Sequence, residues 1–254
     1  MRRRLGVLLL LLATQASAEI PEAERRSGYH DMGASVQAMQ DDDMANPAML
    51  WVVEGENLWK RKAGAAGKSC DDCHGEPERM VVVALRYPAF SDSANRPINL
   101  DQRINQCRTE NQKAPAYAYE SRELLALSAL VSMQSRDQPI QPSADPRLRS
   151  FTEAGAAAFA QRQGQLNLSC AQCHDDNHGK KLGAATIPQA HPTGYPIYRL
   201  EWQSLGSLQR RLRNCLIGMR AEPYAYGAPD YVALELYLMK RAAGMSFEAP
   251  GVRP

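Results

Sequence analysis

The sequence predicts an all-α protein in which a tandem pair of similar helical domains follows an extended N-terminal segment. Matched segments that recur in one order along the chain predict the pair. Gly55 in GENLW matches Gly155 in GAAAF, and RINQC at 103–107 matches RLRNC at 211–215. Apolar residues with helical spacing at the end of each half predict the helices.

Each half ends in a predicted helix that belongs to the repeat. The remaining matched segments are AYAY (116–119) with PYAY (223–226) and LLALSAL (124–130) with VALELYL (232–238), the last pair in the same register as RINQC and RLRNC. Pro229 suits a first helical position and Gly244 suits a stop. Between them Val232, Leu236 and Met239 form one apolar stripe, as expected of a helix that packs on a core.

The segment 1–18 has the pattern of a secretory signal peptide. Three arginines at 2–4 precede a short apolar run at 5–13, and cleavage is expected after Ala18. Loss of the three arginines leaves 27 of the 30 basic residues against 28 acidic ones, so the formal net charge changes from +2 to −1. This charge argues against nucleic-acid or anionic-membrane binding, and no later stretch is long and apolar enough for a membrane helix. We expect a periplasmic protein.

Composition also predicts the domain boundaries. The segment DQPIQPSADPR at 137–147 carries three prolines and little apolar material, as expected of a linker. The predicted organisation is a signal peptide at 1–18, an extended N-terminal segment at 19–47, an N-terminal domain at 48–140 and a C-terminal domain at 148–254.

The six cysteines determine the chemical class of the protein. A C-x-x-C-H motif occurs once in each half: Cys70, Cys73 and His74, then Cys170, Cys173 and His174. This motif attaches haem c, since the two thiols bond to the haem vinyl groups and the histidine becomes the proximal iron ligand. A four-cysteine zinc site and two disulfides are the alternatives, and neither explains a histidine directly after each pair. The sequence therefore predicts two covalently bound haem c groups in two cytochrome c-like domains.

The second axial ligand of each iron has several candidates. Electron-carrying cytochromes c use methionine, and of the methionines only Met219 falls in a suitable loop-like segment. Cys107 and Cys215 instead recur at matching positions, one per half. They could form a disulfide between the domains, remain inert thiols, or ligate their own irons as thiolates. The repeat favours ligation, because it places one cysteine in each half.

Basic residues distinguish Cys215. Arg211 lies four residues before it, so the two share one face of a helix. A guanidinium there would stabilise a thiolate and attract an oxyanion. A solvated helix face is the alternative explanation for the arginines. Cys107 has Arg103 at the same spacing, in a less basic run. His178 and His191 are predicted to be structural, or in the case of His191 to contact a haem propionate.

These residues resemble the SoxA family, the dihaem c-type subunits of bacterial SoxAX complexes. The resemblance covers the mature chain and is densest from Leu168 to Ala243. It implies L-cysteine S-thiosulfotransferase activity, in which thiosulfate is oxidatively joined to a cysteine of the SoxYZ carrier. The electrons would pass through SoxX to an acceptor cytochrome c. The resemblance assigns Cys215 as catalytic residue, often a persulfide, and distal haem ligand, Arg211 as substrate-binding group, and Cys107 as distal ligand of the first haem.

Two other functions compete with this assignment. One is a thiosulfate dehydrogenase that releases tetrathionate and needs neither SoxX nor SoxYZ. The other is a non-enzymatic dihaem electron carrier, which should have histidine and methionine as iron ligands. The length of the resemblance around Cys215 favours the thiosulfotransferase.

Overall fold

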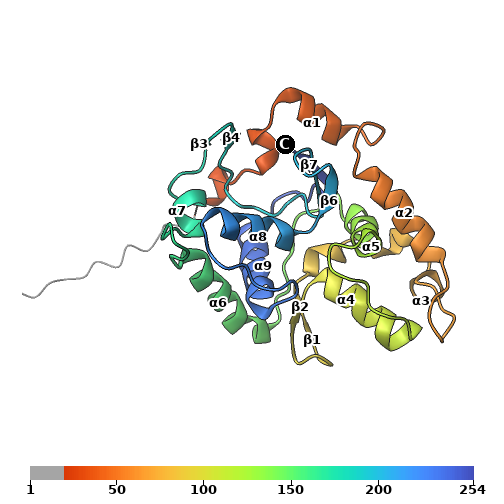
Figure 1. Ribbon diagram of the computed structural model, residues 1–254. Coiled ribbons are helices and arrows are strands. Elements are labelled where there is room, and N and C mark those ends of the chain that lie inside the picture. Colours follow the sequence, from red (N-terminus) through yellow and green to blue (C-terminus); the bar gives the residue numbers. More distant parts are fainter. Residues whose placement is uncertain (1–19) are drawn as a thin grey trace, which may run out of the picture.

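The computed structural model describes residues 20–254. The predicted signal peptide lies outside the described residues. Helices dominate the structure and form two groups, one from each half of the sequence (Figure 1). The α-helices are α1 (Ala34–Asp41), α2 (Met49–Lys60), α3 (Asp71–His74), α4 (Leu100–Cys107), α5 (Arg122–Met133), α6 (Arg149–Ala160), α7 (Cys170–His174), α8 (Leu208–Gly218) and α9 (Pro229–Arg241).

Short strands accompany the helices, which the sequence analysis did not foresee. They are β1 (Ala89–Ser91), β2 (Arg96–Ile98), β3 (Lys181–Leu182), β4 (Ala185–Thr186), β5 (Ile197–Arg199), β6 (Ser204–Gly206) and β7 (Gly251–Arg253). The pairs β1–β2 and β3–β4 are antiparallel, and a small sheet has the order β6-β5-β7 with β7 parallel to β5. The β1–β2 and β5–β6 hairpins occupy matching places in the two halves.

A glycine lets the two main helices of each half cross closely. Helix α2 packs on α5 and α6 packs on α9, as Figure 1 shows. A Cβ at Gly55 would collide with the backbone carbonyl of Ala126, and one at Gly155 would collide with that of Ala233. The repeated glycine found in the sequence therefore marks the same helix crossing in both halves.

The two halves differ by one residue after the repeated cysteine. The separation in sequence between Cys107 and Cys215 is one residue longer than that between Ala126 and Ala233. These two alanines are the residues whose carbonyls lie against Gly55 and Gly155. A π-helical turn (Arg108–Gln112), labelled η5, holds the additional residue directly after Cys107. The predicted alignment of 124–130 with 232–238 was therefore wrong by one residue, although both segments are helical.

The N-terminal segment is not extended throughout, which corrects the prediction. It contains the short 3-10 helices η1 (Glu22–Glu24) and η2 (Gly28–Asp31) before α1. It is fastened to the C-terminal strand, since the Gln40 side-chain oxygen accepts from the Val252 backbone at 2.9 Å and Asn46 donates to Pro250 at 3.1 Å. The segment thus covers the C-terminal half before the chain enters α2.

The linker at 137–147 is also fixed in place. Asp137 donates to the Phe247 carbonyl and Ile140 to the Met245 carbonyl, each at 2.8 Å. Ile140 is buried in an apolar cluster with Phe247 and Met239. The chain between the two halves therefore packs on the C-terminal half and does not act as a free tether.

Candidate active site

The N-terminal cavity lies within the first half and contains one predicted pair of iron ligands. Its volume is about 250 Å³, and His74 and Cys107 both line it. Cys70 and Cys73 also line it, and the remaining wall is largely apolar. The structure therefore brings together all four residues that the sequence assigned to the first haem.

The C-terminal cavity is larger and contains the second pair. Its volume is about 410 Å³, and His174 and Cys215 both line it together with Arg211. Cys170 and Cys173 lie on α7 with His174. The two predicted iron ligands and the predicted substrate-binding residue thus meet in one cavity, whereas Cys170 and Cys173 lie on the adjoining helix and do not line it.

Both attachment motifs fold as one helical turn. Ser169 caps α7 by accepting from the Gln172 backbone at 3.2 Å, and the Gln172 side chain accepts from the Ser169 backbone at 2.9 Å. Ser69 and Asp72 make the equivalent pair of hydrogen bonds at 3.0 and 2.8 Å. A helical turn presents both cysteines and the following histidine to one neighbouring group, which fits the covalent attachment of haem c.

The histidines are suited to ligate iron. His174 Nδ1 lies 2.6 Å from the Pro188 carbonyl, so Nδ1 acts as donor and Nε2 is the nitrogen that could ligate a metal. Burial lowers the pKa of both His74 and His174, which favours the neutral imidazole that binds a metal. An aromatic ring accompanies each histidine, Trp59 at 5.8 Å and Phe159 at 6.4 Å between ring centroids.

His191 supplies a further test of fit. It lines the C-terminal cavity, is buried, and neither ring nitrogen has a hydrogen-bond partner among the described residues. Burial lowers its pKa to about 4, so the ring is neutral. A buried polar group without a partner is costly. A bound group with carboxylate oxygens, such as haem with its propionates, would give His191 an acceptor.

The alternative uses of the cysteines do not fit this arrangement. Cys107 and Cys215 line separate cavities, and all six cysteines are free. Within residues 20–254, no group of three or more histidine, cysteine or acidic side chains is placed to hold a metal ion. The geometry therefore argues against both the disulfide between the domains and the four-cysteine zinc site.

Methionine does not take the place of Cys215. Met219 is buried in a cluster with Leu216 and Tyr231 and does not line the C-terminal cavity. Met80 does line the N-terminal cavity, beside Cys107. Cysteine is thus the residue that recurs in both cavities opposite the attachment motifs.

An ion pair between Arg199 and Glu201 at the C-terminal cavity was not among the predicted site residues. Arg199, at the end of β5, lines the cavity with Arg211. Its Nε donates to Glu201 Oε1 at 2.7 Å, and the same oxygen lies 3.7 Å from Arg211 Nη1. A comparison of the two repeats could have revealed this pair, because the first half has Ser91 and Ser93 at the positions of Arg199 and Glu201.

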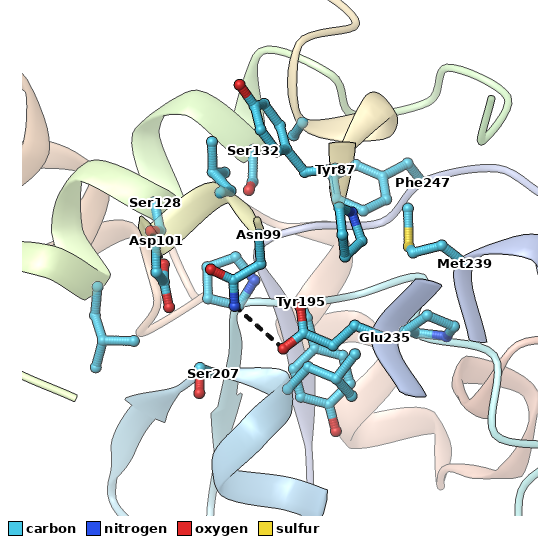
Figure 2. Close-up of a pocket in the computed structure, with 17 residues that line it drawn as sticks. Tyr87, Asn99, Asp101, Ser128, Ser132, Tyr195, Ser207, Glu235, Met239 and Phe247 are labelled. Atoms are coloured by element: carbon cyan, nitrogen blue, oxygen red, sulfur yellow. Dashed lines mark hydrogen bonds between the residues drawn. The ribbon is translucent and has the colours of Figure 1, made fainter. Parts of the chain in front are cut away.

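A central cavity of about 90 Å³ lies between the other two. It shares Tyr87 and Leu100 with the N-terminal cavity, and Tyr195 and Leu208 with the C-terminal one. Figure 2 shows Asn99 of the first half donating to Glu235 of the second, a contact of 3.2 Å.

Two buried carboxyls line this central cavity, Asp101 and Glu235. Glu235 also accepts from Gln209 at 2.7 Å, and Asp101 accepts from the Ser128 hydroxyl. Burial raises the pKa of Asp101 to about 6 and that of Glu235 to about 7. The contact between the halves therefore contains two acids that titrate near neutral pH.

No helix in the part of the chain from residue 20 onward is long and apolar enough to cross a membrane.

Comparison with known proteins gives one consistent family. A model of the SoxA/TsdA cytochrome c domain matches residues 54–140 and 154–247. The L-cysteine S-thiosulfotransferase subunit SoxA of Rhodovulum sulfidophilum is 37% identical over 231 residues, which make up 91% of this chain and 80% of that protein. The subunit of the same name from Paracoccus pantotrophus is 33% identical over 227 residues, covering 89% and 78%.

A solved structure agrees with these relatives. The crystal structure of SoxXA from P. pantotrophus superposes with a TM-score of 0.87 and 32% sequence identity. The match covers 91% of this chain and 87% of that one. The similarity thus extends through both halves and the segment that joins them.

Proposed function

Because this chain belongs to the SoxA family of the SoxA/TsdA cytochromes c, we propose that it is the haem-bearing subunit of an L-cysteine S-thiosulfotransferase that joins thiosulfate to a cysteine of a SoxYZ carrier. One observation carries the proposal. The C-terminal cavity is lined by His174, Cys215 and Arg211, which would serve as an iron ligand, a reactive sulfur and a cation for an anionic substrate. The relatives that match over most of their length are thiosulfotransferase subunits, which favours this function over tetrathionate formation and over simple electron transfer.

The reaction removes two electrons. A carrier thiol and the thiosulfate dianion give a cysteine S-thiosulfonate, one proton and two electrons, so that one S–S bond forms and no atom of thiosulfate is lost. His174 and Cys215 would hold a haem, which would supply the electron acceptor at this site. A SoxX partner, which the SoxXA match supports, would take the electrons on to an acceptor cytochrome c.

The residues of the C-terminal cavity have separate roles in this reaction. Arg211, one helical turn before Cys215 on α8, binds the sulfonate oxygens and aims the outer sulfur at Cys215. The terminal sulfur of a persulfide on Cys215 bonds to that outer sulfur, and the two electrons that this oxidation releases would pass to the haem and on to SoxX. The carrier thiolate then attacks the sulfur that came from thiosulfate, which forms the cysteine S-thiosulfonate and releases the Cys215 persulfide by thiol–disulfide exchange. Pro188 keeps His174 oriented through its carbonyl.

The cofactor proposal is two haem c groups. Cys70 and Cys73 would attach the first, and Cys170 and Cys173 the second. Cys107 and Cys215 would be the distal ligands opposite His74 and His174. Support comes from the two family-domain matches and from the two cavities, each of which contains one histidine and one such cysteine. We also propose a periplasmic location, supported by the signal pattern at 1–18.

The test of function uses the assembled complex with SoxX, the SoxYZ carrier, thiosulfate and an oxidised acceptor cytochrome. Mass spectrometry of the carrier cysteine should find the added thiosulfate group, and Cys215→Ala should reduce this product to background. Tetrathionate in solution with an unmodified carrier would support the dehydrogenase instead. A Cys215→Ala variant with the normal rate would remove Cys215 from the mechanism.

The test of the cofactor assignment is peptide-resolved mass spectrometry of the protein purified with haem maturation intact. Haem is expected on the four cysteines of the two C-x-x-C-H motifs, and additional sulfur on Cys215 alone. A peptide that joins Cys107 to Cys215 by a disulfide would overturn the ligand assignment.

A further inference from the structure

We infer that Arg199 is a second anion-binding residue of the C-terminal cavity and contacts the sulfonate oxygens of thiosulfate together with Arg211. The inference rests on the proposed function and adds a residue to its substrate site. Arg199 lies on β5, and Arg211 lies on α8, so the two cations approach the cavity from different elements.

One carboxylate is shared between these two guanidinium groups. Glu201 Oε1 accepts from Arg199 Nε at 2.7 Å and lies 3.7 Å from Arg211 Nη1. The Arg199 side chain is only 13% exposed, whereas that of Glu201 is 48% exposed. These two positive charges therefore share one partly solvated counter-ion. The carboxylate side chain that lines the cavity, Asp31, pairs with Arg26, so an excess positive charge remains for an anionic ligand.

The electrostatics of the pair agree with this arrangement. Burial and the neighbouring Arg211 charge both lower the pKa of Arg199. For Arg211, burial is outweighed by the charges of Cys215, Tyr195 and Glu201, which raise its pKa. The repulsion between two guanidinium groups is relieved when an anion lies between them. A dianion with three equivalent oxygens can bond to both groups at once, since each guanidinium offers a planar fork of donors.

The other cations that line the cavity have partners of their own or are exposed. Arg253 pairs with Glu248 at 2.7 Å and also donates to the Val252 carbonyl. Lys181 is exposed on the β3–β4 hairpin. Arg199 and Arg211 are thus the cavity-lining cations that share a single carboxylate.

The N-terminal cavity is an internal comparison. It repeats three features of the C-terminal one, because Tyr87, Arg103 and Cys107 occupy the positions of Tyr195, Arg211 and Cys215. It does not repeat a cation at the position of Arg199. The positions of Arg199 and Glu201 correspond to two serines of the first half, whose hydroxyl groups accept from the amide of Gln106. The other arginine of the N-terminal cavity, Arg108, follows Cys107 directly and donates to the Pro115 carbonyl and to Gln112. A cation at the Arg199 position therefore distinguishes the cavity assigned to catalysis from the one that is not.

The test compares Arg199→Gln and Arg199→Lys in the haem-loaded complex with SoxX. Arg220→Gln is the matched control, because Arg220 is exposed in the same half and does not line the cavity. Three quantities are measured: the KM and kcat for thiosulfate in carrier modification, and the Kd of thiosulfate for the oxidised complex by isothermal titration calorimetry without carrier.

Arg199→Gln is expected to raise both KM and Kd by about 10- to 100-fold, the loss typical of one charge-assisted contact, with a much smaller change in kcat. Arg199→Lys should recover part of the affinity, because lysine keeps the positive charge but lacks the planar pair of guanidinium donors. Arg220→Gln should bind as the unmodified protein does. A merely structural role would lower kcat and the unfolding temperature and would give no partial rescue by lysine.

Unchanged KM and Kd in Arg199→Gln would overturn the inference. If that variant does not assemble, Arg199→Lys decides: wild-type KM and Kd in it would exclude the bidentate contact. Failure of the proposed function has a different signature, since the unmodified complex would then leave the carrier unmodified, whether or not it binds thiosulfate.

Discussion

The rings of Tyr119 and Tyr226 stack on each other at the junction of the two halves, with centroids 5.9 Å apart and planes 13° from parallel. The two tyrosines occupy equivalent positions of the repeat, the last residue of AYAY and of PYAY. A residue that packs on its own equivalent lies close to an approximate two-fold axis. The two haem-domain units thus meet through the same surface, much as the subunits of a symmetric dimer do.

Removal of one ring from this stack should weaken the junction. Tyr226→Ala is expected to lower the free energy of unfolding by about 1–2 kcal/mol, from the lost ring contact and the lost apolar burial. Denaturant unfolding of the haem-loaded protein measures the change. Tyr226→Phe is the control, because it keeps the ring, and an equal loss in both variants would assign the effect to the hydroxyl.

The buried acids between the halves should make stability depend on pH. The pKa of Glu235 is raised by burial to about 7 and that of Asp101 to about 6. A raised carboxyl pKa means that the folded protein holds the proton more tightly than the unfolded chain. The contribution of these two groups to the free energy of unfolding is therefore expected to be greatest below about pH 4 and to fall as pH rises through 7.

Glu235→Gln isolates that dependence. The amide keeps a carbonyl oxygen to accept from Asn99 and Gln209 but cannot ionise. Relative to that of the unmodified protein, the free energy of unfolding of the variant should increase by on the order of 3 kcal/mol as the pH rises from 4 to 8. Thermal unfolding across this range checks the slope. Parallel curves for the two proteins would show that Glu235 does not titrate in the folded state.

The glycine at the second helix crossing should not tolerate a side chain. In Gly155→Ala the new methyl group meets the Ala233 carbonyl, so α6 must move away from α9 at a cost of about 1–3 kcal/mol or more. Gly218→Ala, also in a helix, is the control, because nothing lies within 4 Å of its Cβ position. The control should be neutral or slightly stabilising. Thermal unfolding that affected both variants equally would contradict the close crossing.

Disruption of one attachment motif should remove one haem. Cys70→Ser with Cys73→Ser should leave a protein with one haem, and Cys170→Ser with Cys173→Ser should do the same for the other cavity. Only the second change is expected to abolish carrier modification, since that cavity contains Arg211 and Cys215. Intact-protein mass and a haem-extraction assay provide the count. Two haems in either variant would refute the assignment.

Sequence patterns identified candidate residues that the structure places around the same cavities. The C-x-x-C-H motifs and the Arg211 spacing depend on residues a few positions apart, and Cys107 and Cys215 were identified because the repeat places one in each half. The helix that begins at Pro229 was also foreseen, with its end at Arg241 slightly before the expected glycine.

Features that depend on tertiary contacts were not foreseen. The helical turns of the N-terminal segment are held by contacts such as that of Gln40 with the Val252 backbone, at the far end of the chain. Arg199 and Arg211 approach each other only because β5 and α8 adjoin one cavity. The central acids, likewise, are recognisable only after the two halves are packed together.

The π-helical turn after Cys107 has a consequence for how the two halves can be recombined. One additional codon in the first half accounts for it, because the halves keep one register from Tyr87 and Tyr195 to the cysteines and another from Lys113 and Arg220 onward. Chimaeras that exchange the segment after the cysteine must carry the additional codon with it. Without it, the transplanted helix would present the wrong face to the glycine that it is meant to cross.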